Sequence, residues 1–181
     1  MIDIHYASIR EMDISNGEGI GVSLFVQGCP FHCYNCFNSN TWDYDGGQEW
    51  TVDVQSQFLR MLNNPHITRV SLLGGEPLDD KNIKEVLKLV DNIRLYYPNK
   101  TIWLYSGYTW EEIFHNNGVY TLKDHPGLLR QKIVKQCDVL IDGRYIDSKR
   151  DITLHWCGSS NQRVIDVQTT LEKGEIVLWQ T

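Results

Sequence analysis

The sequence lacks a long hydrophobic run and an excess of positive charge. None of its apolar segments approaches the ~20 residues that a membrane-spanning helix needs. The formal net charge is −6, and no cluster of Lys and Arg is interleaved with aromatic residues, which argues against binding to nucleic acid or to anionic membranes. The opening stretch MIDIHYASIREMD lacks the basic-then-apolar layout of a secretory signal. We therefore expect a cytoplasmic protein that binds neither nucleic acid nor membrane.

Internal repeats, low-complexity tracts and an obvious linker are also missing. The length suits one domain with a sizeable core, so we predict a single domain over residues 1–181. Apolar segments bounded by turn residues predict four buried strands, and segments of helical periodicity alternate with them. The strands are expected at 19–28, 68–75, 100–107 and 138–145, and the helices at 51–64, 79–98, 109–114 and 126–137.

Two details refine this pattern. Thr109 and Glu112 have the spacing of a capping box, which predicts a helix start there. Strand-like segments at 163–168 and 175–180 follow the alternating part, and Gly174 is expected in the turn between them. Apolar strands that alternate with helices predict an α/β fold with a parallel sheet. In such sheets ligands collect at the carboxyl ends of the strands.

Cysteine is scarce, and three of the five cysteines lie within the stretch GCPFHCYNCFN, residues 28–38. Cys29, Cys33 and Cys36 have the spacing C-x3-C-x2-C, and no fourth cysteine is near. Thiolates are ligands for zinc, copper(I) and iron–sulfur clusters, and a closed zinc site or an ordinary [4Fe–4S] cluster uses four protein ligands. Three thiolates can hold three irons of a cubane and leave the fourth open to a substrate or cofactor. We favour such a cluster over the alternative, a zinc site completed by His32 or a distant residue.

The triplet resembles the signature of the radical S-adenosylmethionine superfamily. Four further segments occur in order over nearly the whole chain: GGEPL, WLYSGYTWEEI, DVLIDGRYID and GSSNQRVID. With them, the chain resembles the anaerobic ribonucleoside-triphosphate reductase activating proteins. The resemblance implies an open, partial (β/α) barrel of the radical S-adenosylmethionine type, with a mostly parallel sheet that contains roughly six parallel strands.

The resemblance also implies an activity and two cofactors. Cys29, Cys33 and Cys36 are expected to bind a [4Fe–4S] cluster whose unique iron is chelated by S-adenosylmethionine. Reductive cleavage of this cofactor gives a 5′-deoxyadenosyl radical, which takes a hydrogen atom from a glycine of the anaerobic ribonucleoside-triphosphate reductase. The implied partners are the glycyl-radical subunit of that reductase and a small electron donor such as flavodoxin.

The residues that the resemblance assigns to cofactor binding lie at the ends of three of the predicted strands or shortly after them. Glu76 is expected to accept a hydrogen bond from the ammonium group of S-adenosylmethionine, and Ser106 to contact its carboxylate or ribose. Because Asn35 is not aromatic, contact with the adenine is expected through the backbone. Each residue also has a purely structural reading, as a turn former or, for Phe37, as part of the core. The complete cofactor-binding set is Asn35, Cys36, Phe37, Gly74, Gly75, Glu76 and Ser106.

Other segments remain open between two readings. Asp142 or Arg144 is expected to face the cofactor or the glycine loop of the partner, or else to form a loose ion pair in a solvent-facing turn. The segment GSSNQR is either a docking surface for the reductase or an ordinary polar loop. Trp42 and Trp50 flank a stretch that either covers the cluster or simply packs. Cys137 and Cys157 receive no role.

Three other functions remain as alternatives. The first is an activase of the pyruvate formate-lyase type, against which the GSSNQR segment and the short length argue. The second is an enzyme like 7-carboxy-7-deazaguanine synthase, which shares GGEP but not the later motifs. The third is a zinc-stabilised binding module without catalysis.

Overall fold

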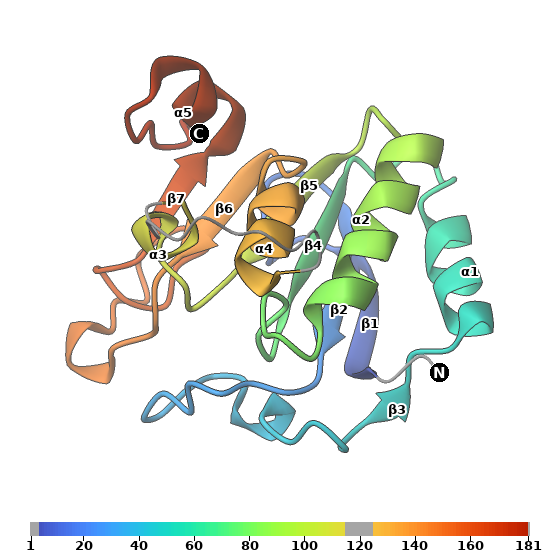
Figure 1. Ribbon diagram of the computed structural model, residues 1–181, viewed down its shortest axis with the longest axis horizontal. Coiled ribbons are helices and arrows are strands. Elements are labelled where there is room, and N and C mark those ends of the chain that lie inside the picture. Colours follow the sequence, from blue (N-terminus) through green and yellow to red (C-terminus); the bar gives the residue numbers. More distant parts are fainter. Residues whose placement is uncertain (1–3, 115–124, 181) are drawn as a thin grey trace.

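The computed structural model describes residues 4–114 and 125–180. These ranges form one seven-stranded sheet in the order β3-β1-β2-β4-β5-β6-β7 (Figure 1). The strands are β1 (His5–Asp13), β2 (Gly21–Val26), β3 (Gln48–Glu49), β4 (Arg69–Gly74), β5 (Thr101–Tyr105), β6 (Val139–Asp142) and β7 (Arg163–Asp166). The helices are α1 (Val52–Met61), α2 (Ile83–Tyr96), α3 (Trp110–Phe114), α4 (Pro126–Val134) and α5 (Val167–Lys173), with 3-10 turns at Ser39–Thr41 and Asp147–Lys149.

The centre of the sheet confirms the predicted α/β fold. The strands β2, β4, β5 and β6 pair in parallel, and they correspond to the four strands expected from the sequence. The expectation of roughly six parallel strands is wrong. The outer strands pair antiparallel, β1 with both β2 and β3, and β7 with β6. The reason is connectivity, since a parallel pair needs a crossover, usually a helix, and no α-helix joins β1 to β2 or β6 to β7, which are linked by loops and one short 3-10 turn.

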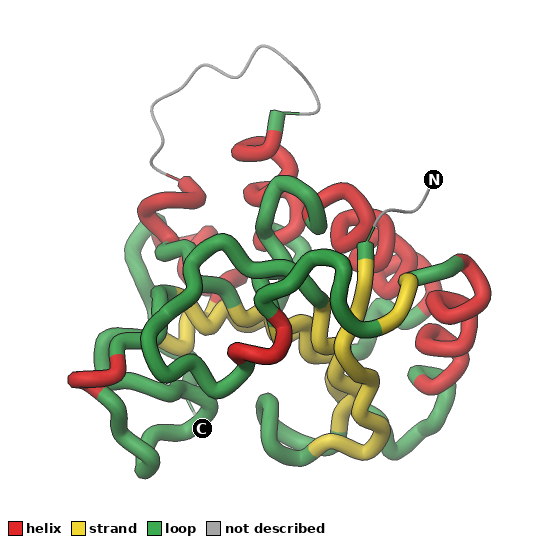
Figure 2. The backbone as a smooth tube through the Cα atoms, turned by 90° about the horizontal axis from the view of Figure 1, so that it is seen from below, coloured by secondary structure: helices red, strands yellow, loops and turns green. Residues whose placement is uncertain are grey.

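The helices α1, α2 and α4 cover one face of the sheet (Figures 1 and 2). The helix predicted over 51–64 is confirmed as α1. It packs on the core through Val54, Phe58 and its C-cap residue Leu62, the last two being fully buried. Alternate residues of β5 and β6 face the opposite side of the sheet, where Trp103 and Ile141 belong to a second, smaller apolar cluster. In the two described ranges, the helices are too short or too polar to cross a membrane.

The C-terminal part differs from the prediction. The residues between the two expected strands form helix α5, which Asp166 caps by accepting a hydrogen bond from the Thr169 N–H at 3.0 Å. Gly174 ends this helix in the left-handed conformation, with φ of 71°, and so does not join two strands. Of the expected strand 175–180, only a single bridge between Ile165 and Leu178 forms.

The predicted capping box is confirmed at the start of α3. The Thr109 N–H donates to Glu112 Oε2 at 2.8 Å, and the Glu112 N–H donates to Thr109 Oγ1 at 3.2 Å. This pair fixes the point at which the chain leaves β5 and turns into a helix.

Arg69 anchors the connection between β1 and β2. Its side chain is fully buried, and its guanidinium donates to the backbone carbonyls of Asp13, Asn16 and Glu18 at 2.6, 2.6 and 3.2 Å. This role could not be predicted from the sequence, because an arginine at the start of a buried strand resembles a surface residue. Since Asn16 lines the cavity described below, Arg69 also positions one wall of it.

We expect Arg69→Met to lower the free energy of unfolding by about 3 kcal/mol, because three buried carbonyls lose a charged donor. Urea denaturation of the apoprotein measures this difference. The exposed Arg60 provides the control, and Arg60→Met should change stability by no more than about 0.5 kcal/mol. Equal effects of the two substitutions would show that Arg69 is not an anchor.

Candidate active site

A cavity of about 430 Å³ opens at the carboxyl ends of the parallel strands. This volume lies in the range typical of small-molecule sites. Four loops contribute to the wall of this cavity. They follow β2, β4, β5 and β6 in turn. The lining residues from these loops include Cys29, Phe31, Cys33, Cys36, Phe37, Gly75, Glu76, Ser106, Gly107, Gly143, Arg144 and Tyr145.

The cysteine segment after β2 presents all three thiols to this cavity. Cys29, Cys33 and Cys36 are partly exposed and form no disulfide. Two residues between them, His32 and Asn35, have positive φ of 45° and 55°. These left-handed residues are rare outside glycine and reverse the chain twice within a few positions. These reversals lie between three cysteines that all border the same cavity.

The donor chemistry of this segment fits an iron–sulfur cluster. Burial raises the pKa of the Cys29 thiol to about 11 and also raises that of Cys33, so metal binding must displace their protons. Thiolates free of disulfides are the usual ligands of such clusters. In the part of the chain that the structure describes, no three His, Cys, Asp or Glu residues gather around a single-ion site.

The glycines of GGEP allow the loop after β4 to touch the cysteine segment. The Gly75 N–H donates to the Val26 carbonyl and the Glu76 N–H donates to the Gly28 carbonyl, each at 2.8 Å. A Cβ on Gly75 would stand 2.4 Å from the Gly28 oxygen, and one on Gly74, which has φ of 101°, would stand 2.8 Å from the Phe25 Cα. A side chain at Gly75 would force the two loops apart, and one at Gly74 would force the ends of β4 and β2 apart.

Glu76 is buried and ties the loops after β4 and β5 together. One carboxylate oxygen accepts from the Leu78 N–H at 2.8 Å and from the Ser106 hydroxyl at 2.9 Å, and the other accepts from the Gly107 N–H at 2.7 Å. Burial raises the pKa of Glu76 to about 7, although these hydrogen bonds oppose the increase. The structure thus brings Glu76 and Ser106 together, as the sequence suggests for residues at neighbouring strand ends.

Asn82 supports this arrangement and was missed from the sequence. Its amide nitrogen donates to the carbonyls of Gln27 and Glu76, both at 2.9 Å. The side chain is buried and joins the end of β2 to the GGEP turn. No motif could have identified it, because an asparagine shortly before a helix is a common capping residue.

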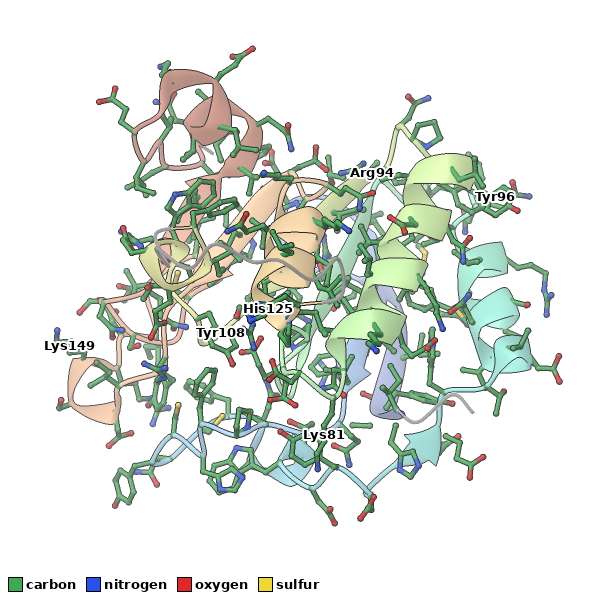
Figure 3. The ribbon with its side chains drawn as sticks, viewed as in Figure 1. Lys81, Arg94, Tyr96, Tyr108, His125 and Lys149 are labelled. Carbon is green, nitrogen blue, oxygen red and sulfur yellow. The ribbon has the colours of Figure 1, made fainter. Side chains whose placement is uncertain are left out.

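The remaining candidates for cofactor binding differ in whether they line the cavity. Phe37 lines the cavity and is 59% exposed, so the alternative that it belongs to the core is wrong. Asn35 is exposed and does not line the cavity. Phe31 was not among the candidates, yet its ring packs edge-on against Tyr108, with ring centroids 4.9 Å apart, and lies under the Arg144 guanidinium at 4.3 Å. Tyr108 is labelled in Figure 3.

Asp142 and Arg144 have different roles. Arg144 lines the cavity and pairs with Glu112 at 3.2 Å. Asp142 does not line it. Its buried carboxylate accepts from the Trp110 N–H at 2.8 Å and pairs with Arg163. The expectation of a loose, solvent-facing ion pair is therefore wrong for Asp142, because that residue is only 1% exposed.

The GSSNQR segment folds back onto the loop after β6. Gln162 Oε1 accepts from the Gly158 N–H at 2.9 Å, and Gln162 Nε2 donates to the Gly143 carbonyl at 2.9 Å. Asn161 donates to the Arg144 carbonyl at the same distance. These contacts hold the cavity wall in place, and a docking role for the segment remains a prediction.

The two tryptophans that flank the stretch between residues 42 and 50 also have different surroundings. Trp42 lines the cavity, whereas Trp50 is fully buried in edge-on contact with Tyr6 and Phe58. Of the cysteines without a predicted role, Cys137 lies in the core and Cys157 lines the cavity.

Comparisons with known proteins identify the family. Residues 15–165 match the family model of the 4Fe-4S single cluster domain. The chain is 36% identical over 163 residues to the anaerobic ribonucleoside-triphosphate reductase-activating protein of Escherichia coli (strain K12). This match covers 89% of this chain and 97% of that protein. The proteins of the same name from Vibrio cholerae and Enterobacteria phage T4 are 33% and 34% identical, and these matches cover 88% and 89% of this chain and 96% and 93% of those proteins.

The chain belongs to the family of anaerobic ribonucleoside-triphosphate reductase-activating proteins. The three cysteines at the cavity lie within the residues that match the 4Fe-4S single cluster domain. The match to the iron–sulfur family model favours this reading of the cysteine segment over the zinc-stabilised module.

The raised pKa of Glu76 leads to a pH-dependent stability. Because the folded carboxyl has a pKa of about 7 and the unfolded one 4.5, the folded state holds the proton more tightly. This tighter binding of the proton stabilises the folded state. The stabilisation is complete below pH 4.5 and is lost as the pH rises to 7. The difference of about 2.5 units corresponds to roughly 3 kcal/mol.

We therefore expect the free energy of unfolding of the apoprotein to fall by roughly 3 kcal/mol from pH 4.5 to 7.5, relative to Glu76→Gln. Urea denaturation at the two pH values measures this. Glu49→Gln, on the exposed strand β3, serves as the surface control. If the wild type and Glu76→Gln change in parallel, the carboxyl of Glu76 does not titrate as stated.

Proposed function

We propose that this protein activates the anaerobic ribonucleoside-triphosphate reductase, with a [4Fe–4S] cluster on Cys29, Cys33 and Cys36 and S-adenosylmethionine bound beside it. The observation that carries the proposal is the convergence of three free thiols on one cavity at the carboxyl ends of four parallel strands. Membership in the activating-protein family supports it.

The chemistry that the bound groups supply is one-electron cleavage of S-adenosylmethionine to methionine and a 5′-deoxyadenosyl radical, followed by removal of a hydrogen atom from a glycine Cα of the reductase. The chain itself has to hold the two groups against each other and keep water from the reacting atoms. The cysteine segment is the part that binds the cluster, and its own backbone reversals fix the three ligands.

The GGEP turn is suited to the amino end of S-adenosylmethionine. A carboxylate has about four acceptor positions, and Glu76 uses three for the loops around it. One position is left for the ammonium group of the ligand. Gly74 and Gly75 bring the backbone close to the same place, and Ser106 is held beside them by its bond to Glu76.

The adenosyl end is expected along the cysteine segment. The exposed ring of Phe37 and the backbone of Cys36 border the cavity there. The side chain of Asn35 is exposed, so its contact is expected through its backbone. The open sheet with its cavity at the carboxyl edge supports the partial-barrel fold expected for the radical S-adenosylmethionine type, with residues 1–181 as a single domain.

The partners follow from the same chemistry. The glycyl-radical subunit of the reductase must bring its glycine to the cavity, and a small donor such as flavodoxin must supply the electron. Both are proteins that we expect to meet this chain in the cytoplasm. Activation of a pyruvate formate-lyase is the less favoured alternative, because the relatives compared above carry the reductase in their names.

After anaerobic reconstitution with iron and sulfide, we expect Cys33→Ala to lose the brown cluster absorbance and at least 100-fold of the S-adenosylmethionine cleavage, on the order expected when a required catalytic group is lost. Cys137→Ala is the matched control, because Cys137 is buried in the core and its thiol bonds to the Ile133 carbonyl. It should keep most of both signals. Equal loss in the two variants would mean that the ligands are wrongly assigned.

The reductase itself provides the decisive experiment. The reduced protein is mixed with S-adenosylmethionine and the anaerobic ribonucleoside-triphosphate reductase, and an electron paramagnetic resonance spectrum is recorded. We expect a glycine-centred doublet on the reductase, absent when Cys33→Ala replaces the wild type. A spectrum without this doublet, from wild-type protein that cleaves S-adenosylmethionine, would exclude the reductase as the partner.

A further inference from the structure

Four buried polar side-chain atoms have no hydrogen-bond partner in the part of the chain that the structure describes. They are Gln27 Oε1, Trp42 Nε1, Tyr105 Oη and Asn161 Oδ1. Two of these residues, Trp42 and Tyr105, line the cavity. An indole N–H is a donor and never an acceptor, and leaving a buried donor unpaired is costly. The Nε1–H of Trp42, a residue of the cavity wall, therefore lacks the acceptor that a buried indole normally has.

Trp42 lies against the cysteine segment. Its carbonyl accepts a hydrogen bond from the Cys29 N–H at 3.1 Å. Its indole stacks on the imidazole of His32, with ring centroids 4.6 Å apart and an angle of 22° between the ring planes. These two contacts join Trp42 to the first cysteine and to the residue before the second. Trp42 thus belongs to the end of the cavity that the cluster is expected to occupy.

We propose that the Nε1–H of Trp42 donates a hydrogen bond to a sulfur atom of the cluster and thereby raises the reduction potential of the cluster. This inference rests on the proposed function, because it requires the cluster. Thiolate and sulfide sulfurs carry negative charge, which increases when the cluster is reduced. A donor aimed at such a sulfur stabilises the reduced form more than the oxidised form. Trp42 is in this sense a positioning and tuning residue, and it takes no part in bond breaking.

Another tryptophan shows what a satisfied indole looks like in the same chain and provides a matched control. The Nε1–H of Trp179 donates to Glu18 at 3.0 Å, and Trp179 does not line the cavity. Replacing either Trp42 or Trp179 by phenylalanine removes one indole N–H and keeps an aromatic ring. The two variants differ in whether that N–H can reach the cluster.

The test compares the midpoint potential of the cluster in the wild type, Trp42→Phe and Trp179→Phe. Each full-length protein is reconstituted anaerobically with iron and sulfide, its iron content is measured, and a redox titration is followed by electron paramagnetic resonance. We expect full iron content in all three and a lower potential in Trp42→Phe alone. A tenfold smaller equilibrium constant for one-electron reduction would lower the midpoint potential by about 59 mV.

A second measurement works on the wild type and does not depend on the variant taking up a cluster. Protein with ¹⁵N-labelled indole is reduced, and pulsed electron paramagnetic resonance is used to look for coupling between the cluster spin and an indole nitrogen. We expect this coupling in the wild type and in Trp179→Phe. Its absence from the reduced wild type would overturn the proposal, as would an unchanged potential in Trp42→Phe.

The two proposals fail differently. Wild-type protein that takes up a cluster but shows no indole coupling would overturn only the role of Trp42. Wild-type protein that takes up no iron would overturn the proposed function, and the role of Trp42 with it. A shift of potential in Trp179→Phe equal to that in Trp42→Phe would show that loss of any indole N–H has the same effect, which also overturns the proposal.

Discussion

The hydrogen bonds of the Glu76 carboxylate are the interaction on which the cavity depends. The three donors come from the GGEP turn and from the loop after β5, while the backbone of the same turn bonds to the cysteine segment. One buried acid therefore connects three strand ends. A buried carboxylate is tolerated only when it is hydrogen-bonded, so the loops that satisfy it are held in a single arrangement.

Much of the fold could be predicted from the sequence, because the four central strands are buried on both faces and appear as continuous apolar segments. The strand β1 could not be found this way, since several of its residues are exposed. The helix α5 was missed because its capping residue Asp166 also ends a strand. The antiparallel edges depend on loop lengths and pairing partners, which local patterns do not encode.

The candidate site was predicted where neighbouring residues share a motif. The cysteines, Gly75, Glu76 and Ser106 all follow apolar strands, and the structure places them around one cavity. Residues that act through distant contacts gave no such signal. Asn82, Phe31 and Arg69 are examples, because each makes its decisive contacts with residues far away in the sequence. The motif located the site, and only the tertiary structure showed what holds it together.

The second apolar cluster contains three indoles in edge-on contact. Trp103 lies between Trp156 and Trp179, with ring centroids 4.7 and 5.7 Å away, and Trp156 also borders the cavity. Through this row of rings the C-terminal segment, which carries Trp179, is packed by way of Trp103 against a residue of the cavity wall.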